Sequence, residues 1–257
     1  MKAQAMLGWY ERWMNQPVYT EYYEHSGYFN FGYWDDGANT QAQACEHLIE
    51  RLLNFLPERR GRLVDMACGM GATTAYLISH CPEMNILGAN LSWHQLQAAR
   101  QVAPRASFAL MDAAYPALAS GCADDILCVE AAFHFQTRRQ FLAEAYRVLK
   151  PGGHLVLADI LFHRLPGNIR PYVPVENFVG DEGAYRQELL ASGFTSVKTV
   201  DATRTCWQGY LRHTRRWAMH QLRARQIPRI DYLRLMIIPL VGPFLVKRYL
   251  LAAARKA

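Results

Sequence analysis

The stretch from Leu63 to Thr74, LVDMACGMGATT, constrains the fold of this chain more than any other. It opens with an apolar pair, passes Asp65 and enters a turn of small residues that holds Gly69 and Gly71, and a helix-compatible run follows. A strand, a tight glycine turn and a helix form the first βα unit of a doubly wound sheet. Glycine adopts positive φ, and its missing Cβ lets a ligand lie on the backbone. The turn also leaves N–H groups at a helix N-terminus, which suit a carboxylate or phosphate.

The rest of the chain alternates strand-like and helix-like segments in the order that a parallel sheet requires. Strands are expected at residues 62–66, 85–90, 106–111, 125–129, 154–159, 194–201 and 248–254. Helices are expected at residues 40–56, 72–80, 92–102, 137–149, 181–192 and 207–225. Capping patterns at Thr40, Ser92 and Thr137 open three of these helices. We therefore predict an α/β fold, with a doubly wound and mostly parallel sheet of seven strands.

Three segments stand apart from this alternation and are expected to cover the sheet's ligand-binding edge. Residues 1–39 are dense in Tyr and Trp and are predicted to form an aromatic cap, with a hydrophobic cluster that only packs as the alternative. Residues 40–257 would form the ligand-binding domain. Within it, the proline-rich residues 160–180 are expected to be an inserted lid, and residues 205–246 a C-terminal cap.

Composition bounds the possible partners and the compartment. With 257 residues, half of them hydrophobic, the chain can bury one large core. Its formal charge of +6 keeps nucleic acid open as a partner. The six cysteines contain no CxxC pair, which favours reduced thiols in the cytoplasm, and the N-terminus does not resemble a signal peptide. The apolar run 235–246 is too short to span a bilayer.

Four motifs in a fixed order carry a family resemblance. They are the glycine turn, GANLSWHQL at residues 88–96, MDA at residues 111–113, and VEAAFHF at residues 129–135 with RVLKPGG at residues 147–153. Together with Gly32-Tyr33-Trp34 upstream, they resemble the class I S-adenosylmethionine (SAM) methyltransferases, in particular the sugar and macrolide O-methyltransferases of natural-product biosynthesis. The chain departs from the family at Ala67, where glycine is usual, and at Asn90, where an acid is usual.

The resemblance implies a set of SAM contacts. Asp65, with the carbonyls of the following turn, would face the ammonium group, and Asn90 with Gln95 would bind the two ribose hydroxyls. Asp112 would accept from the adenine amino group, unless it is a plain turn residue. The residues expected to bind SAM, or S-adenosylhomocysteine after transfer, are Tyr33, Asp65, Ala67, Gly69, Gly71, Asn90, Leu91, Gln95, Asp112, Ala113 and Glu130.

His134 is the candidate general base. It follows the fourth predicted strand at its C-terminal end, where doubly wound folds place ligands. Asp159 ends the next strand, and tips of adjacent strands lie ~4.8 Å apart. The two are therefore predicted to form a base and its orienting carboxylate. The alternative is an ordinary core or loop histidine.

These patterns predict a SAM-dependent methyltransferase that acts on a hydroxyl of a small hydrophobic specialised metabolite. Its acceptor pocket would be roofed by residues 19–34, 161–179 and 232–246, with Tyr22, Tyr33, Phe162 and Met236 in the lining. The alternatives are an N- or C-methyltransferase and a SAM-binding cyclase; an RNA methyltransferase is disfavoured because no nucleic-acid module is attached. Residues 235–246 could instead make a peripheral membrane or dimer contact. No metal is expected, and the chain would be a monomer or homodimer.

Overall fold

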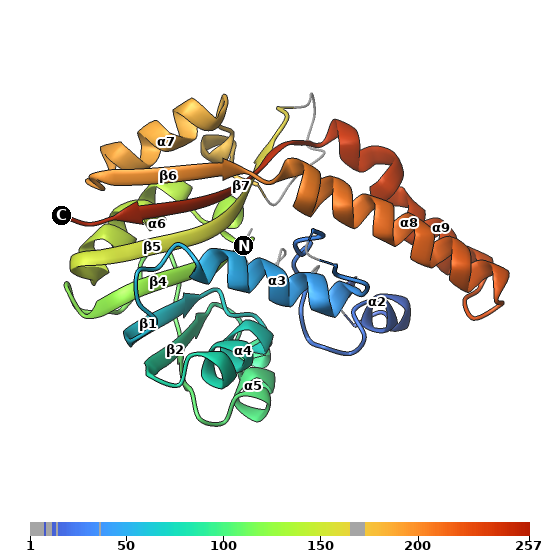
Figure 1. The fold of residues 1–257 in the computed structure, drawn as a ribbon, viewed down its shortest axis with the longest axis horizontal. Coiled ribbons are helices and arrows are strands. Elements are labelled where there is room, and N and C mark those ends of the chain that lie inside the picture. Colours follow the sequence, from blue (N-terminus) through green and yellow to red (C-terminus); the bar gives the residue numbers. More distant parts are fainter. Residues whose placement is uncertain (1–7, 9–11, 14, 36, 165–172) are drawn as a thin grey trace.

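In the computed structural model, a seven-stranded sheet runs through the molecule with helices on both faces (Figure 1). The structure describes residues 8, 12–13, 15–35, 37–164 and 173–257. The strand order is β3-β2-β1-β4-β5-β7-β6. The strand bounds are β1 Gly61–Met66, β2 Met84–Asn90, β3 Ser107–Leu110, β4 Ala123–Val129, β5 Leu149–Phe162, β6 Ser196–Asp201 and β7 Val246–Arg255. Strands β3, β2, β1, β4 and β5 pair in parallel, in that order across the sheet. Strand β7 is antiparallel to its neighbours β5 and β6. The predicted doubly wound, mostly parallel sheet is confirmed.

The helices begin where their capping residues predict. The side chains of Thr40, Ser92 and Thr137 each accept a hydrogen bond from the backbone N–H three residues later. Such caps satisfy N–H groups that the first helical turn leaves unpaired. The helix bounds are α2 Pro17–Tyr22, α3 Gln41–Leu53, α4 Ala72–His80, α5 Trp93–Val102, α6 Arg138–Val148, α7 Glu182–Ala191, α8 Gln208–Arg223 and α9 Arg229–Val241. Short helical turns are η1 Ala132–His134, η2 Val175–Asn177, η3 Thr203–Trp207 and η4 Gly242–Phe244.

Two hydrophobic cores lie on opposite faces of the sheet. Because successive strand residues point to opposite faces, Leu63 belongs to the core under α3 and α4, whereas Val64 belongs to the core under α6 and α7. The first core also takes in buried aromatic residues from the N-terminal segment and from α8. Tyr22, Tyr23 and Tyr28 of the aromatic N-terminal segment are therefore packed into the core of the domain.

The first three residues of the predicted lid, 160–162, belong to strand β5. Strand β5 continues to Phe162 because β7 offers it a long antiparallel partner, with Ile160 opposite Tyr249 and Phe162 opposite Val246. Residues 165–172 of the expected lid lie outside the described part of the chain. What the structure shows of the remainder is a short segment, residues 173–180, that includes η2.

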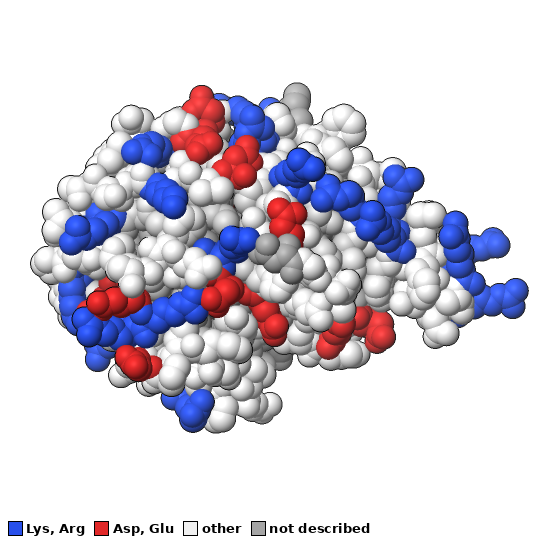
Figure 2. All heavy atoms as spheres, viewed as in Figure 1, with Lys and Arg blue, Asp and Glu red and all other residues white. Residues whose placement is uncertain are grey.

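The predicted C-terminal cap is a helical hairpin. The basic helix α8 ends at Arg223, and the apolar run after it forms α9, which sequence patterning did not predict. The two helices pack together and extend away from the sheet (Figure 1). Basic side chains gather over this hairpin and at its far end (Figure 2). Within the described residues, no helix has the length and apolar character needed to cross a bilayer.

Candidate active site

A cavity of about 1140 Å³ opens at the C-terminal ends of the parallel strands. Its walls include the turn after β1 and the ends of β2 and β4. The three segments assigned above to the acceptor pocket also contribute, through Tyr19, Phe162 and Val241 among others. Pockets for a single small molecule usually measure about 300–1,000 Å³. The cavity is therefore large enough for a cofactor and a second molecule together.

The glycine turn presents backbone to this cavity. Ala67 and Gly69 line it, with φ of 63° and 56°. A Cβ built on Gly69 would meet no atom within 4 Å, so the space in front of this backbone is open. The turn is held from behind, because the N–H of Cys68 donates to the carbonyl of Ala89 at 3.1 Å. This bare backbone beside a helix N-terminus fits the amino-acid part of SAM.

Two residues predicted to bind the cofactor have structural roles behind the turn. Gly71 does not line the cavity; its φ is 88°, and an added Cβ would lie 2.8 Å from Ala99 on α5. Asp65 is buried below the turn and accepts a 2.6 Å hydrogen bond from the Thr74 hydroxyl. Burial raises the pKa of its carboxyl to about 6. In the structure both residues hold α4 in place, and neither is among the residues that line the cavity, so their contact with the cofactor stays a prediction.

Neutral polar groups mark the next part of the wall. Asn90 and Gln95 both line the cavity, and the Asn90 amide nitrogen donates to Gln95 Oε1 at 2.7 Å. This bond fixes the Asn90 amide so that its oxygen can accept a hydroxyl hydrogen. Asp112 follows; its Oδ1 accepts from the N–H of Ala114 at 2.8 Å. Leu91, Asp112 and Ala113 all lie on the cavity wall.

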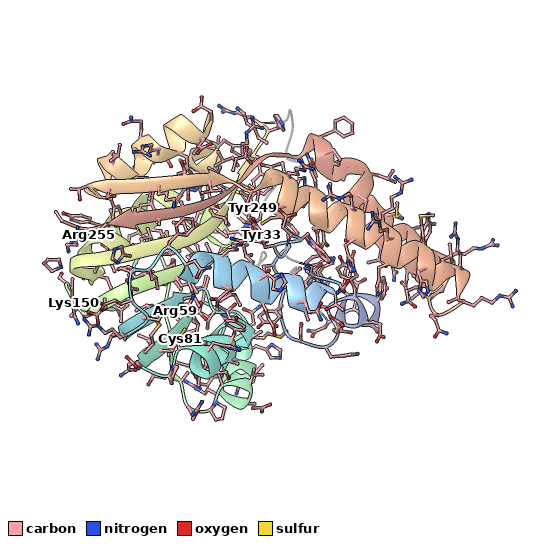
Figure 3. All side chains as sticks on the ribbon, viewed as in Figure 1. Tyr33, Arg59, Cys81, Lys150, Tyr249 and Arg255 are labelled. Carbon is pink, nitrogen blue, oxygen red and sulfur yellow. The ribbon has the colours of Figure 1, made fainter. Side chains whose placement is uncertain are left out.

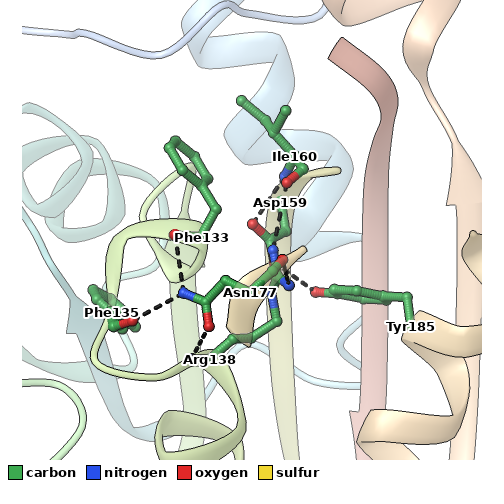
Figure 4. Close-up of polar contacts among 7 residues, drawn as sticks. All are labelled: Phe133, Phe135, Arg138, Asp159, Ile160, Asn177 and Tyr185. Carbon is green, nitrogen blue, oxygen red and sulfur yellow. Dashed lines mark hydrogen bonds and ion pairs between the residues drawn. The ribbon is translucent and has the colours of Figure 1, made fainter. Parts of the chain in front are cut away.

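His134 lies on the same wall in the turn η1. It is half-buried, and its ring lies 4.1 Å from that of Phe133, measured between centroids. The carbonyls on either side of it, those of Phe133 and Phe135, both accept from the Asn177 side-chain amide at 3.0 and 2.9 Å. Asn177 thus fixes the loop that carries His134 from both ends (Figure 4).

Asp159 does not orient His134, contrary to the sequence-based prediction. It is fully buried, and its Oδ2 accepts from Arg138 Nε at 2.7 Å and from the Tyr185 hydroxyl at 3.1 Å. Its Oδ1 accepts from the N–H of Ile160 (Figure 4). The Arg138 guanidinium is itself buried, so it needs this carboxylate as its counter-charge. Asp159 lies on β5, the strand beside β4, but it pairs with the buried guanidinium of Arg138 on α6.

Glu130 lines the cavity at the end of β4 and joins three parts of the chain. Its Oε1 accepts from the N–H of Phe31 at 2.7 Å and from the hydroxyl of Tyr249 at 2.6 Å. Tyr249, labelled in Figure 3, belongs to β7. Burial raises the pKa of Glu130 to about 8. A neutral carboxyl therefore fastens the N-terminal segment to the sheet.

Three other predicted site residues face away from the cavity, and one faces it. Tyr33 lies under the Arg51 guanidinium, 4.8 Å from ring centroid to carbon. Tyr22 is buried and bonds Thr214 and Gln41, and Met236 packs in the small core between α9 and α2. Phe162 does line the cavity. Residues on a helix or an extended segment alternate between faces, and sequence patterning did not distinguish those faces at Tyr22, Tyr33 and Met236.

Several aromatic and apolar residues of the wall were missed. Tyr28, Phe29 and Phe31 line the cavity from the N-terminal segment, and Trp207 and Val173 line it from farther along the chain. The density of aromatic residues before residue 35 identified the right segment. It did not identify the right side chains, because that choice depends on the path of the segment across the sheet edge.

Comparisons with known proteins agree with this geometry. Residues 64–157 match the family model described as a methyltransferase domain. Methyltransferase GfsG of Streptomyces halstedii is 35% identical over 141 residues, which are 51% of this chain and 50% of that protein. The 27-O-demethylrifamycin SV methyltransferase of Amycolatopsis mediterranei is 32% identical over 188 residues, 70% of this chain and 63% of that protein. This chain thus spans between half and two thirds of the length of these relatives.

Solved structures match over nearly the whole chain. The [4+2]-cyclase SpnF superposes with a TM-score of 0.72 at 19% identity, covering 93% of this chain and 91% of that chain. Other matching structures were solved with SAM or S-adenosylhomocysteine bound. Residues 64–157 thus form a methyltransferase domain, and the chain has the fold of methyltransferases whose structures were solved with S-adenosylhomocysteine or SAM bound. The residues around the glycine turn and the ends of β2 and β4 fit that cofactor.

Proposed function

We propose that this protein transfers the methyl group of SAM to a hydroxyl of a small hydrophobic specialised metabolite. The observation that carries the proposal is that His134 lines the same cavity as Gly69, Asn90 and Asp112, the residues that would contact SAM. The remainder of the wall is largely aromatic and aliphatic. The names of two relatives, the 27-O-demethylrifamycin SV methyltransferase and an erythromycin 3''-O-methyltransferase, support an acceptor of this kind.

In the proposed reaction, His134 acts as the general base. When bound, SAM supplies an electrophilic methyl group on its sulfonium. The His134 ring takes the proton of the acceptor hydroxyl, and the hydroxyl oxygen forms a bond to the methyl carbon while the carbon–sulfur bond breaks. The products are a methyl ether, S-adenosylhomocysteine and the imidazolium of His134. A positioned general base typically contributes ~10²–10⁴-fold to the rate.

The chain's other contribution is position. A displacement of this kind needs the acceptor oxygen in line with the breaking bond, and holding it there lowers the barrier. Asn177 fixes the His134 loop through two carbonyls. Aromatic side chains of the N-terminal segment and of β5 cover the cavity, which keeps water from competing with the acceptor.

The His134→Ala variant tests the proposal. With a panel of hydroxylated polyketides and phenols as acceptors, we expect formation of S-adenosylhomocysteine to fall ~10²–10⁴-fold while SAM affinity, measured by calorimetry, is unchanged. The matched control is His94→Ala, since His94 is exposed on α5 and lies off the cavity wall. Full activity of the His134→Ala variant would remove the histidine from the mechanism.

A second candidate function uses the same cavity without methyl transfer. The fold likeness to the cyclase SpnF and the departures at Ala67 and Asn90 favour it. In this case His134 and the aromatic residues of the cavity wall would hold a substrate in a reactive conformation. The substrate would cyclise while SAM stays intact. Mass spectrometry of the reaction mixture separates the two functions. A converted acceptor without an added methyl group, together with unconsumed SAM, would support the cyclase. A product that carries the new methyl group on nitrogen or carbon would show that the acceptor atom is not an oxygen.

A further inference from the structure

The helix α9 carries two apolar faces. One face is buried, with Leu235 and Met236 packed against Val18, Tyr19 and Ala218. The other is exposed along the length of the helix and into the turn after it, at a spacing of three or four residues that keeps the side chains on one side. We call this the α9 stripe; its members and their exposed fractions are Ile230 55%, Leu233 59%, Ile237 56%, Leu240 65%, Val241 44% and Phe244 72%.

The stripe is a concentration of exposed apolar surface. The described part of the chain has thirteen exposed large hydrophobic side chains, and six of them fall within these fifteen residues. Single exposed apolar residues are normal on proteins, but a contiguous set usually marks an interaction site. Ile237 and Val241 also line the cavity, so the stripe continues into the cavity wall.

The same hairpin carries the chain's excess of positive charge. From Gln208 to Val241 there are seven arginines and one acidic residue, Asp231, which gives a net charge of +6. This equals the formal net charge of the whole chain, so the remaining residues balance. Basic side chains gather at the far end of the hairpin in Figure 2. Arg229 and Arg234 lie on either side of the stripe, by their positions on the helix.

We propose that the α9 stripe docks this protein on the surface of an anionic lipid bilayer. Its apolar side chains would enter the boundary between headgroups and acyl chains, and the hairpin arginines would contact lipid phosphates. Charge argues against a second copy of the chain on this face, because pairing two stripes would bring two hairpins of +6 together. The cavity wall formed by Ile237 and Val241 would then face the bilayer, where an apolar acceptor concentrates.

Vesicle co-flotation of the full chain tests the proposal without reference to its reaction. We expect binding to vesicles of phosphatidylglycerol and phosphatidylcholine at low salt. Binding to phosphatidylcholine alone should be much weaker, and high salt should weaken binding to the anionic vesicles. Each arginine near an anionic surface is worth about 1 kcal/mol, so the Arg223→Gln/Arg229→Gln variant should lose roughly 30-fold in partitioning.

The contribution of the apolar side chains is tested with the double variant Leu233→Gln/Leu240→Gln, which changes two residues of the α9 stripe that do not line the cavity. We expect its partitioning to fall at least about tenfold with the fold retained by circular dichroism. The matched control, Val102→Gln/Val200→Gln, removes two exposed apolar residues elsewhere on the domain and should bind like the wild type.

Three outcomes would overturn the proposal. One is the lack of wild-type binding to anionic vesicles at low salt. Another is equal binding by the wild type and the Leu233→Gln/Leu240→Gln variant. The third is a dimer in ultracentrifugation that this variant dissociates, which would assign the stripe to a second copy of the chain.

Discussion

At the residue scale, Glu130 shows how one half-buried carboxyl can serve both assembly and site. Its Oε1 accepts from the Phe31 N–H and the Tyr249 hydroxyl, so one atom ties the N-terminal segment to β7. Burial favours the neutral form and raises the pKa of the carboxyl to about 8. In the unfolded chain the carboxyl would titrate near its ordinary value of about 4.3.

This difference predicts a pH dependence of stability. Between the unfolded and folded pKa values, the folded state binds one more proton than the unfolded state, so the free energy of unfolding falls as the pH rises from 5 to 8. Glu130→Gln keeps the accepting oxygen and cannot ionise. We expect it to flatten this decline and to hold more stability than the wild type at pH 8, measured by urea unfolding at pH 5, 6.5 and 8. Parallel curves for the two proteins would show that Glu130 is charged in the folded state.

At the element scale, the contact between α8 and the N-terminal segment determines how the cavity is covered. Gly209 opens α8 directly against the Trp34 ring, where an added Cβ would lie 2.5–2.6 Å from three Trp34 side-chain atoms. The Trp34 indole N–H donates to the Phe31 carbonyl at 2.9 Å, and Phe31 lines the cavity. A displacement of Trp34 is therefore passed to the cavity wall.

Gly209→Ala should loosen this cover. Overpacking costs about 1–3 kcal/mol and the gain in helix propensity offsets about 1 kcal/mol, so we expect a net loss of up to about 2 kcal/mol, with weaker SAM binding. Thermal unfolding and calorimetry measure the two effects. The control is Gly183→Ala in the first turn of α7, whose added Cβ meets only Asp181 Oδ1, at 3.2 Å. Unchanged SAM affinity in the Gly209→Ala variant would show that the cavity wall at Phe31 does not depend on the contact between Trp34 and α8.

At the scale of the whole molecule, the chain folds around its hydrophobic cores without disulfide bonds. All six cysteines are free thiols, and five of them are buried. Burial raises the pKa of Cys45, Cys68, Cys81, Cys128 and Cys206. The thiolate is the reactive form, so burial should suppress thiol chemistry in all five.

Thiol titration measures this packing across the domain. With a disulfide reagent at pH 7.5, we expect one fast-reacting thiol in the native protein, the half-buried Cys122, and all six after denaturation. A Cys122→Ser variant should react only slowly while native. Several fast thiols in that variant would indicate that one of the two cores opens on the timescale of the assay.

The sequence by itself determined the local and the repeated features of this protein. Hydrophobic periodicity and the caps at Thr40, Ser92 and Thr137 predicted the helices, because those signals act over three or four residues. The order of strands and helices predicted the sheet. Parallel strands bring their C-terminal ends to one edge, so Gly69, Asn90, Asp112 and His134 could be assigned to one cavity without coordinates.

Tertiary structure alone decided which long-range partner each buried polar group takes. Asp159 pairs with Arg138 because a buried guanidinium needs a counter-charge, and nothing in the local pattern marks Arg138 as buried. Tyr22 and Tyr33 turn away from the cavity although Phe31 lines it, since the path of the segment sets each side chain's direction. The run after Pro228 became α9 because it packs on α8 and α2, so the same helix also exposes the apolar stripe. Periodicity is a local property, whereas these choices depend on what the folded chain places opposite each residue.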